Sequence, residues 1–587
     1  MTAHRALAAP RAGGRRGLRA IAGAALAGLI ATMLSLVAPV AANAANIDEF
    51  DPGYLISDDL FYDGGAMSES QIQSFLNGKL GSCSNSNCLK SYKQTTSSRA
   101  ATPRCAAYAG AASEPAARII FKVQQACGIS AKVLLVMLQK EQGLITNKGP
   151  SADKLKIAMG YGCPDTAACD SLYFGFMNQV YSAAAQFQRY RQSPGGFRHQ
   201  VGVPMNLYYH PNSVYASPPK CGTLRVTIKN DATAGLYNYT PYTPNAAALA
   251  NPYGTGDSCS SYGNRNFFVF YSDWFGSPAG KLPTSVAKSR LAGDDRYKTS
   301  AAVSASAYPD PSTVTTVFVA SGENFPDGLS AAPAAAIAGA PLLLTKKGSL
   351  PGAIKNELLR LDPDRIIVVG GTPSVSKTVE NQLREIAAVT RLAGDDRYAT
   401  SRAIARYAFP DGAPEVFIAI GNNFPDALAA SAAAGFREIP VILVPHKASS
   451  ADSATRQLIA QLGATRVYVA GNTSAIKNSY LDSLKSGTQV TGFTRLGGSS
   501  RYQTAAAINT QFFTEPTAAY LVSGKKFPDA LSVAAVAGVQ GAALHLSPGN
   551  CLPGGAVAHM TLTGVEKLVF VGSSATLGSG AWGYKPC

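Results

Sequence analysis

The sequence predicts a multidomain protein with a mainly α-helical, disulfide-containing N-terminal domain, followed by three α/β repeats with parallel sheets. Ten cysteines, eight of them before residue 260, indicate the disulfides of the first part. Three motifs indicate the repeats, because they recur in one order at intervals of about 100 residues, the size of a small domain. The motifs are RLAGDDRY from Arg290 and Arg391 with RLGGSSRY from Arg495, Phe-Pro-Asp from Phe325, Phe424 and Phe527, and VVGGTPS, VAGNTSA and VGSSATL from Val368, Val469 and Val571.

Residues 1–44 are expected to be a secretory signal peptide. An arginine-rich start leads into an apolar run from Ile21 to about Val40, and Ala42-Asn43-Ala44 fits a small-residue cleavage site. An uncleaved membrane anchor is the alternative. Later segments are too polar to span a bilayer. We therefore expect a secreted protein with no integral membrane segment after cleavage of the signal.

The cysteine count agrees with export to an oxidising compartment, where disulfides persist. Because C-x-x-C is missing and the chain has only six histidines, we expect neither a metal site nor a cofactor. The expected disulfides are the local pairs Cys83–Cys88 and Cys163–Cys169, the longer loops Cys221–Cys259 and Cys551–Cys587, and the remaining pair Cys105–Cys127.

Changes in composition set the expected domain boundaries. Residues 47–275, where tyrosine and cysteine are frequent, are expected to form the first domain. The stretch that follows is rich in Gly and Pro and predicts a linker over residues 276–288. The repeats are then expected at residues 289–386, 387–490 and 491–587.

An apolar helix in the first domain ends in a single carboxylate. Ser130 is a suitable N-cap, and residues 133–138 are apolar on most sides, which predicts a buried helix. Glu141 stands at the C-terminal end, where the helix dipole and burial both favour the protonated acid. We therefore take Glu141 as a candidate catalytic acid, with ion pairing to Lys140 or Lys148 as the alternative.

Each repeat alternates strands and helices, and its strands are continuously apolar. Such strands indicate a parallel sheet that is covered on both faces. In the first copy we expect strands at 317–321, 341–345 and 365–369 with helices at 328–339 and 353–361, and in the second copy strands at 416–420, 441–444 and 467–469.

The repeated motifs have a structural and a functional interpretation. Pro suits a first helical turn and Asp favours a helix N-terminus, so Phe-Pro-Asp can be structural. The paired Asp residues of RLAGDDRY are expected to cap helices that open near Thr299, Thr400 and Thr504. The functional alternative is an anion site made of helix N-termini and arginines. A nucleotide site is not expected, because the chain lacks GxGxxG and the P-loop lysine.

The tandem RLAGDDRY, NFPDAL and VVGGTPSVS strings resemble the type 2 cell-wall-binding repeat of Gram-positive surface proteins. The resemblance covers residues 290–587. It implies a Rossmann-like fold for each repeat, a pseudo-threefold arrangement of the three copies, and noncovalent attachment to anionic polymers of the cell wall. Linked weak sites would add avidity for a repetitive partner.

The segment 128–143 resembles the catalytic helix of the goose-lysozyme and lytic-transglycosylase superfamily. GFMNQ, ending at Gln179, is similar to the superfamily's Gly-Leu-Met-Gln segment with one extra residue. LYNYTP, which contains Tyr237, is similar to its Ala-Tyr-Asn-x-Gly segment. The resemblance implies a lysozyme-like domain in which Gln179 and Tyr237 bind substrate beside Glu141. Gln142 stands where the superfamily usually has Ser, and Thr240 where it has Gly.

These resemblances imply a lytic transglycosylase or muramidase that cleaves the glycan strands of peptidoglycan. Glu141 would protonate the leaving oxygen, and Asp165 or Asp170 would be the second carboxylate of a hydrolase. The alternative is a noncatalytic surface adhesin or glycan-binding protein. We expect peptidoglycan and an anionic wall polymer as partners, at the cell wall or cell surface. Nucleic acid is not expected: of the formal charge of +16, five charges are arginines of the predicted signal, the remaining +11 is mild and spread out, and no recognition motif is present.

Overall fold

The computed structural model describes residues 45–164, 167–211, 220–279, 282 and 286–587. The predicted signal peptide, residues 1–44, lies outside this part of the chain. Among the helices of the described residues, none has the length and apolar character that crossing a membrane requires.

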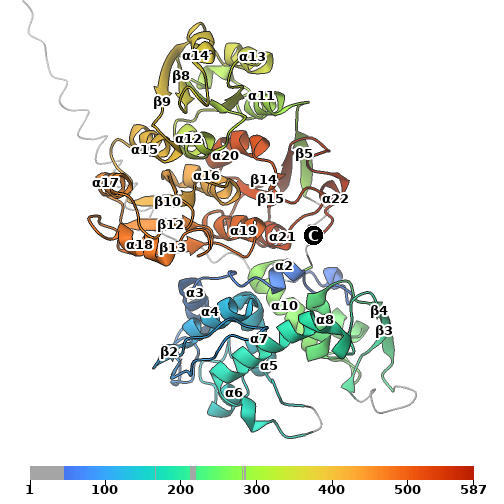
Figure 1. The fold of residues 1–587 in the computed structure, drawn as a ribbon. Helices are drawn as coiled ribbons and strands as arrows, with labels where there is room; N and C mark the ends of the chain where they lie inside the picture. Colours follow the sequence, from blue (N-terminus) through green and yellow to red (C-terminus); the bar gives the residue numbers. More distant parts are fainter. Residues whose placement is uncertain (1–44, 165–166, 212–219, 280–281, 283–285) are drawn as a thin grey trace, which may run out of the picture. The chain divides into compact units, whose positions relative to one another are not determined.

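The N-terminal region is mainly helical, as predicted, and carries two short antiparallel strand pairs (Figure 1). Its longer helices are α3 (Glu69–Leu80), α4 (Ala116–Cys127), α5 (Ala131–Gln142), α7 (Phe176–Gln192), α8 (Asp231–Tyr239) and α10 (Gly263–Phe275). The strand pairs are β1 (Lys93–Gln94) with β2 (Glu114–Pro115) and β3 (Pro204–Tyr208) with β4 (Thr223–Thr227).

Helix α5 is the buried helix that the apolar run predicts. Residues 133–138 are all fully buried, and α4 and α10 pack against the helix. Ser130 occupies the N-cap position, although its hydroxyl makes no capping hydrogen bond. The helix ends at Gly143, whose φ of +67° is a left-handed conformation that glycine adopts without strain. Glu141 is therefore held in the last turn of a rigid core helix.

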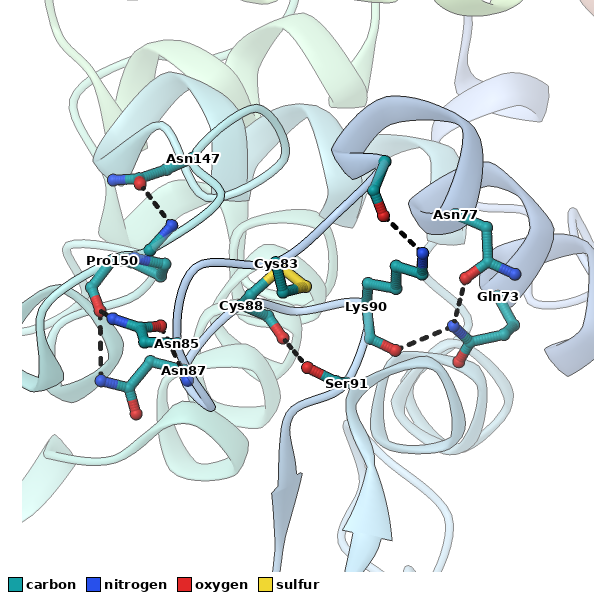
Figure 2. The surroundings of a disulfide bond; sticks show 12 residues. Gln73, Asn77, Cys83, Asn85, Asn87, Cys88, Lys90, Ser91, Asn147 and Pro150 are labelled. Atoms are coloured by element: carbon teal, nitrogen blue, oxygen red, sulfur yellow. Dashed lines mark hydrogen bonds between the residues drawn. A yellow bond between two sulfur atoms is a disulfide. The ribbon is translucent and has the colours of Figure 1, made fainter.

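All five predicted disulfides are present, and the ten cysteines are all paired. The Cys83–Cys88 bond closes a short loop after α3 (Figure 2). Two side chains of that loop, Asn85 and Asn87, each donate a hydrogen bond of 3.1 Å to the carbonyl of Pro150. The disulfide thus holds a loop whose amides tie down a segment about 65 residues further on.

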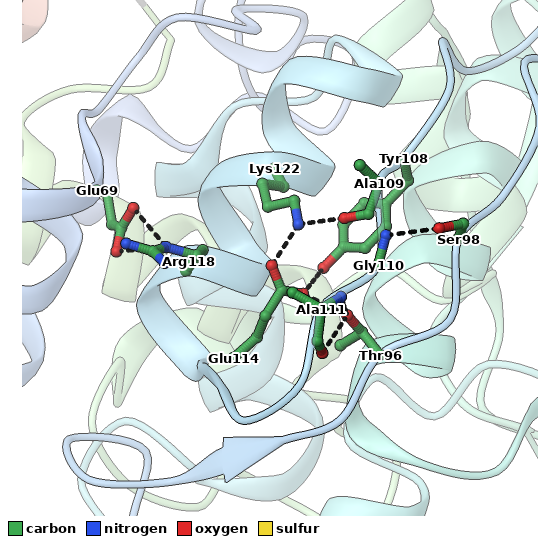
Figure 3. Close-up of polar contacts among 10 residues, drawn as sticks. All are labelled: Glu69, Thr96, Ser98, Tyr108, Ala109, Gly110, Ala111, Glu114, Arg118 and Lys122. Carbon is green, nitrogen blue, oxygen red and sulfur yellow. Dashed lines mark hydrogen bonds and ion pairs between the residues drawn. The ribbon is translucent and has the colours of Figure 1, made fainter.

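A buried carboxylate organises the loop between β1 and α4 (Figure 3). Glu114 accepts hydrogen bonds from the hydroxyls of Thr96 and Tyr108 and pairs with Lys122. Burial alone would raise the pKa of Glu114, but the bonds from Lys122, Thr96 and Tyr108 outweigh it and lower the pKa. These bonds cross-link the loop to α4.

The C-terminal part contains three four-stranded parallel sheets, which confirms the prediction of parallel-sheet repeats. The sheet orders are β7-β6-β8-β9, β11-β10-β12-β13 and β15-β14-β16-β5. The strands are β5 (Ala287–Leu291), β6 (Thr316–Ser321), β7 (Leu342–Thr345), β8 (Arg365–Val369), β9 (Ala388–Leu392), β10 (Glu415–Ile420), β11 (Val441–Val444), β12 (Arg466–Ala470), β13 (Gly492–Leu496), β14 (Ala518–Ser523), β15 (Ala543–Ser547) and β16 (Lys567–Val571).

Helices alternate with the strands along the chain, as parallel pairing of successive strands requires. They are α11 (Arg296–Ala307), α12 (Pro326–Ile337), α13 (Gly352–Leu361), α14 (Lys377–Arg384), α15 (Arg397–Ala408), α16 (Pro425–Arg437), α17 (Ser453–Gln461), α18 (Asn478–Leu484), α19 (Arg501–Phe512), α20 (Pro528–Gln540), α21 (Gly554–Thr563) and α22 (Ser579–Trp582).

The helices after the RLxGxxRY motif begin three residues earlier than predicted. They start at Arg296, Arg397 and Arg501 instead of near the threonines. The cause is the residue before each arginine, because Asp295, Asp396 and Ser500 are N-caps whose side chains accept amide hydrogen bonds. The threonines lie inside the helices, where each accepts a hydrogen bond from a motif glycine.

The strand that opens each motif belongs to the sheet of the preceding repeat. β9 pairs with β8 and β13 pairs with β12, in parallel. β5, which opens the motif of the first repeat, pairs with β16 of the last one, so that the green strand lies among red elements (Figure 1). The repeats therefore form a closed ring in which every sheet contains a strand from a neighbouring copy.

Three Ala-rich helices, α12, α16 and α20, form the centre of the ring, and each contacts the other two. Small residues permit this close approach, since Cα of Gly538 is 3.3 Å from the position that a Cβ at Gly435 would occupy. Near the N-terminal ends of these helices, the rings of Phe325, Phe424 and Phe527 meet with centroids 5.7–5.9 Å apart. The Phe-Pro-Asp motif thus packs the three repeats together.

Candidate functional site

Three corresponding clefts lie where neighbouring repeats meet, and each is lined by all three motifs. We name them by the repeats that they join: cleft 1/2, cleft 2/3 and cleft 3/1. Their volumes are about 230, 210 and 470 Å³. In each cleft, one repeat supplies Phe-Pro-Asp and the glycine-containing motif, and the next repeat supplies RLxGxxRY. The aspartate and the arginine that meet in a cleft lie about 70 residues apart in the sequence in cleft 1/2 and more than 200 apart in cleft 3/1.

A largely buried aspartate forms the floor of each cleft. Burial raises the pKa of Asp426 to about 6, although Thr504 donates a hydrogen bond to it and the positive charge of Arg501 is near. Asp529 is its counterpart in cleft 3/1, where burial likewise raises the pKa to about 6 against the opposing effect of Arg296. Burial also raises the pKa of Asp327 in cleft 1/2.

The two arginines of each motif hold the loops that shape the clefts. The first one reaches back to the preceding repeat: Arg391 Nη1 donates to the carbonyl of Gly370 at 2.6 Å, and Arg495 makes the same bond to Gly471 at 3.0 Å. The second one bonds within its own repeat, as Arg397 Nη1 does to the carbonyl of Gly421 at 2.7 Å. These bonds support the structural interpretation of the motif, and the second arginine of each motif also lines a cleft.

Glu141 lies in the N-terminal region beside a lysine. Its carboxylate is 2.7 Å from Lys140 Nζ, and its side chain is 23% exposed, while that of Lys140 is 3% exposed. Lys140 Nζ also donates a 2.6 Å hydrogen bond to Thr240 Oγ1. The second carboxylate oxygen faces Gly160, whose missing side chain leaves 3.1 Å between that oxygen and a hypothetical Cβ. The ion pair with Lys140 that the sequence left open as an alternative is therefore present.

Gln179 and Tyr237, the predicted substrate-binding residues, are both fully buried. The Gln179 amide accepts hydrogen bonds from the backbone of Met159 and Tyr161 and donates to the carbonyls of Tyr161 and Tyr173. It thereby holds the loop that carries Gly160 against Glu141. The hydroxyl of Tyr237 contacts Thr243 Oγ1 at 3.3 Å.

Tyr239 is the tyrosine that approaches Glu141, whereas the resemblance to the lysozyme superfamily implied Tyr237. Burial, together with the negative charge of Glu141, raises the pKa of Tyr239 well above the ordinary value. Its hydroxyl donates to the carbonyl of Met159 at 2.7 Å. The helical repeat explains the difference, because Tyr237 and Tyr239 lie two residues apart on α8 and face different directions. Of the candidate second carboxylates, Asp165 lies outside the described residues, and Asp170 caps the turn at Leu172.

The geometry of the repeats agrees with a family match. The model of the family "Cell wall binding domain 2 (CWB2)" matches residues 290–380, 391–481 and 495–579. The C-terminal part of this chain therefore carries three cell wall binding domain 2 repeats.

Two curated proteins match about half of this chain. The chain is 30% identical over 298 residues to the N-acetylmuramoyl-L-alanine amidase LytC of Bacillus subtilis, a match that covers 50% of this chain and 57% of the amidase. It is 27% identical over 288 residues to the amidase enhancer of the same organism, covering 49% of this chain and 38% of the enhancer. The chain thus spans about half the length of these relatives or less. Among solved structures, Cwp8 from Clostridium difficile matches with a TM-score of 0.46 and 27% identity, covering 54% of this chain and 53% of Cwp8.

Proposed function

We propose that this is a secreted protein that attaches noncovalently to anionic polymers of the cell wall through its three repeats. The observation that carries the proposal is the convergence of the three motifs of the matched family in one cleft per repeat boundary. In each cleft the N-terminus of a central helix and an arginine of the next repeat lie together, an arrangement that suits an anionic group. The names of the amidase and the amidase enhancer support a location at the wall.

The N-terminal domain is proposed to be lysozyme-like and to cleave the glycan strands of peptidoglycan. Glu141 would donate its proton to the leaving glycosidic oxygen, after which the carboxylate would accept a proton from the attacking hydroxyl. Its position at the end of a buried helix, with the loop around Gly160 held by Gln179, fixes the direction of the carboxylate. Lys140 would stabilise the carboxylate that forms after proton transfer.

A noncatalytic, glycan-binding N-terminal domain is the second candidate, and a specific observation favours it. The ion pair between Lys140 and Glu141 uses the carboxylate that would have to hold a proton, and Lys140 is itself fixed by Thr240. In that case the domain would keep its fold and bind glycan without cutting it.

The two candidates are separated by incubating peptidoglycan with the protein and analysing the soluble products by mass spectrometry. A lytic transglycosylase releases 1,6-anhydro muropeptides, a muramidase releases reducing ones, and a glycan-binding protein releases none. Glu141→Gln is expected to abolish release without changing the fold. Glu69→Gln, which removes a carboxylate paired with Arg118 at the surface, is the matched control and should be as active as the wild type. An active Glu141→Gln protein would refute the catalytic role.

Wall attachment is tested with isolated sacculi. The protein should bind them, and binding should fall after chemical extraction of the anionic polymers, because the clefts are proposed to hold those polymers. Binding that survives extraction unchanged would refute the polymer as the ligand.

A further inference from the structure

The three clefts share a shape but differ in charge at corresponding positions. The residue pair before Phe-Pro-Asp is Glu323-Asn324 in the first repeat, Asn422-Asn423 in the second and Lys525-Lys526 in the third. The pair before the second motif arginine differs as well, since Ser499-Ser500 stands in the third copy where the other copies have two aspartates. The clefts join different repeats, so each receives its own combination of these pairs.

Cleft 3/1 combines the dibasic pair with a neutralised aspartate. Lys525, Lys526 and Arg296 line it, and the two lysines are exposed. Asp294 Oδ2 is paired with Lys298 Nζ at 2.6 Å across one helical turn. Asp295 caps α11 by accepting the amides of residues 297 and 298. Asp529 also lines the cleft, so Lys525, Lys526 and Arg296 face one carboxylate that neither caps a helix nor pairs with Lys298, and the cleft is the largest of the three, at about 470 Å³.

In cleft 1/2, acidic lining residues outnumber basic ones. Asp327, Asp395 and Asp396 line it, with Arg397 as the single basic lining residue. Ala399 occupies the position of Lys298, so Asp395 has no cation one turn further along its helix. Glu323 precedes the lining residue Asn324, and its carboxylate accepts a hydrogen bond from the backbone amide of Lys347 at 3.2 Å. An anion that enters here meets more negative than positive charge.

Cleft 2/3 is intermediate in charge between the other two clefts. The serine pair removes both exposed carboxylates, which leaves Asp426 opposite Arg501, with His446 at the side. Ser500 keeps the helix cap that aspartate makes elsewhere, as it accepts the amide of Gln503. The substitution therefore changes the charge of the cleft while it preserves the local structure.

We propose that the three clefts differ in affinity, and that cleft 3/1 is the principal binding site for an anionic group of the wall polymer, while cleft 1/2 binds such groups most weakly. This inference rests on the proposed function and refines it. The ligand is a sugar polymer that carries phosphate or carboxylate groups at intervals. Cleft 3/1 holds one such group between Lys525, Lys526 and the N-terminus of α20, and the attraction weakens as salt screens it. The last repeat therefore contributes most of the affinity together with the first.

The proposal is tested by titrating the full-length protein calorimetrically at low salt with inorganic tripolyphosphate, and in parallel with a trimer of galacturonate. One dominant site per chain is expected for at least one of the two probes, and the preferred probe identifies phosphate or carboxylate as the recognised group. Lys525→Asn/Lys526→Asn should weaken that site by about tenfold, which corresponds to about 1.4 kcal/mol for the two lysines together. The matched control Lys355→Asn/Lys567→Asn removes two exposed lysines that line none of the three clefts and should bind as the wild type does.

A transplant gives the reciprocal test. Glu323→Lys/Asn324→Lys, introduced into the Lys525→Asn/Lys526→Asn protein, should restore part of the binding through cleft 1/2. The proposal is overturned if neither probe binds, if three equal sites are found, or if the control variant loses as much affinity as the Lys525/Lys526 variant. Binding to sacculi distinguishes failure of this site from failure of the proposed function. If the Lys525/Lys526 variant attaches to the wall polymer as the wild type does, cleft 3/1 is not the principal site, although the proposed function still holds.

Discussion

Asp426 and Gly471 approach each other so closely that a Cβ at Gly471 would lie 2.7 Å from Asp426 Oδ2. Gly471 also has a φ of +104°, which side chains rarely adopt. The other repeats make the same contact, with Gly370 against Asp327 and Gly572 against Asp529. The glycine-containing motif is therefore required by the buried aspartate of the Phe-Pro-Asp motif.

Gly471→Ala is expected to destabilise the protein by about 2–4 kcal/mol, because it combines backbone strain with a clash against a carboxylate. Gly487→Ala is the matched control: its φ is +75°, but nothing lies within 4 Å of the new Cβ, so it should cost only about 1 kcal/mol. Urea denaturation measures both. Equal losses in the two variants would show that the contact with Asp426 is unimportant.

The raised pKa of Asp426 predicts how stability depends on pH. Between its unfolded value of 3.8 and its folded value of about 6, the folded protein holds a proton that the unfolded chain has lost. The stability contributed by this group is therefore fully present below pH 3.8 and is lost as pH rises through 6. Asp426→Asn, which stays neutral, should be more stable than the wild type by about 1–3 kcal/mol at pH 7.5 and no more stable at pH 3.8. Denaturation curves at both pH values check this, and an advantage that does not depend on pH would contradict it.

Because β5 closes the ring on β16, a substitution in β5 is expected to destabilise β16, which is far away in the sequence. Ala287 N donates to the carbonyl of Glu566 at 2.8 Å, and strand alternation gives Ser289 the next bond to β16. Ser289→Pro removes that donor and should cost about 1–3 kcal/mol. Hydrogen exchange should then become faster in β16, almost 300 residues away in sequence. The amides of β8, whose neighbour β9 is intact, are the internal control and should keep their protection. Equal effects on β8 and β16 would argue against a specific role for β5.

Much of the fold follows from short-range patterns in the sequence. The apolar strands at 365–369 and 441–444 have the bounds that their composition predicts, and the Pro of Phe-Pro-Asp starts each central helix. Two of the disulfides, Cys83–Cys88 and Cys163–Cys169, join cysteines that are close in sequence and therefore meet easily. The helices of the RLxGxxRY motif begin three residues before the predicted threonines, because the second residue of the Asp-Asp or Ser-Ser pair caps the helix.

The surroundings of the candidate catalytic residue were harder to predict. The sequence places Glu141 at the end of a buried helix, and the structure agrees. The sequence does not reveal that the Gln179 amide makes four hydrogen bonds to the backbone. Nor does it reveal that Tyr239, not Tyr237, approaches Glu141. Both facts depend on which faces of α7 and α8 are directed toward Glu141. That orientation is set by tertiary packing against residues that are far away in the chain.

By itself, the sequence determined the number of repeats, the alternation of strands and helices, the positions of Phe-Pro-Asp at helix starts and the charge of each loop. These properties depend on residues within a few positions of one another. Only the tertiary structure decided that β5 closes the ring on β16, that Gly471 must make room for Asp426, and that Lys525 and Lys526 share a cleft with Arg296. The physical reason is that each of these contacts joins segments between about 45 and 280 residues apart, and the burial of the central helices, not a local preference, brings them together.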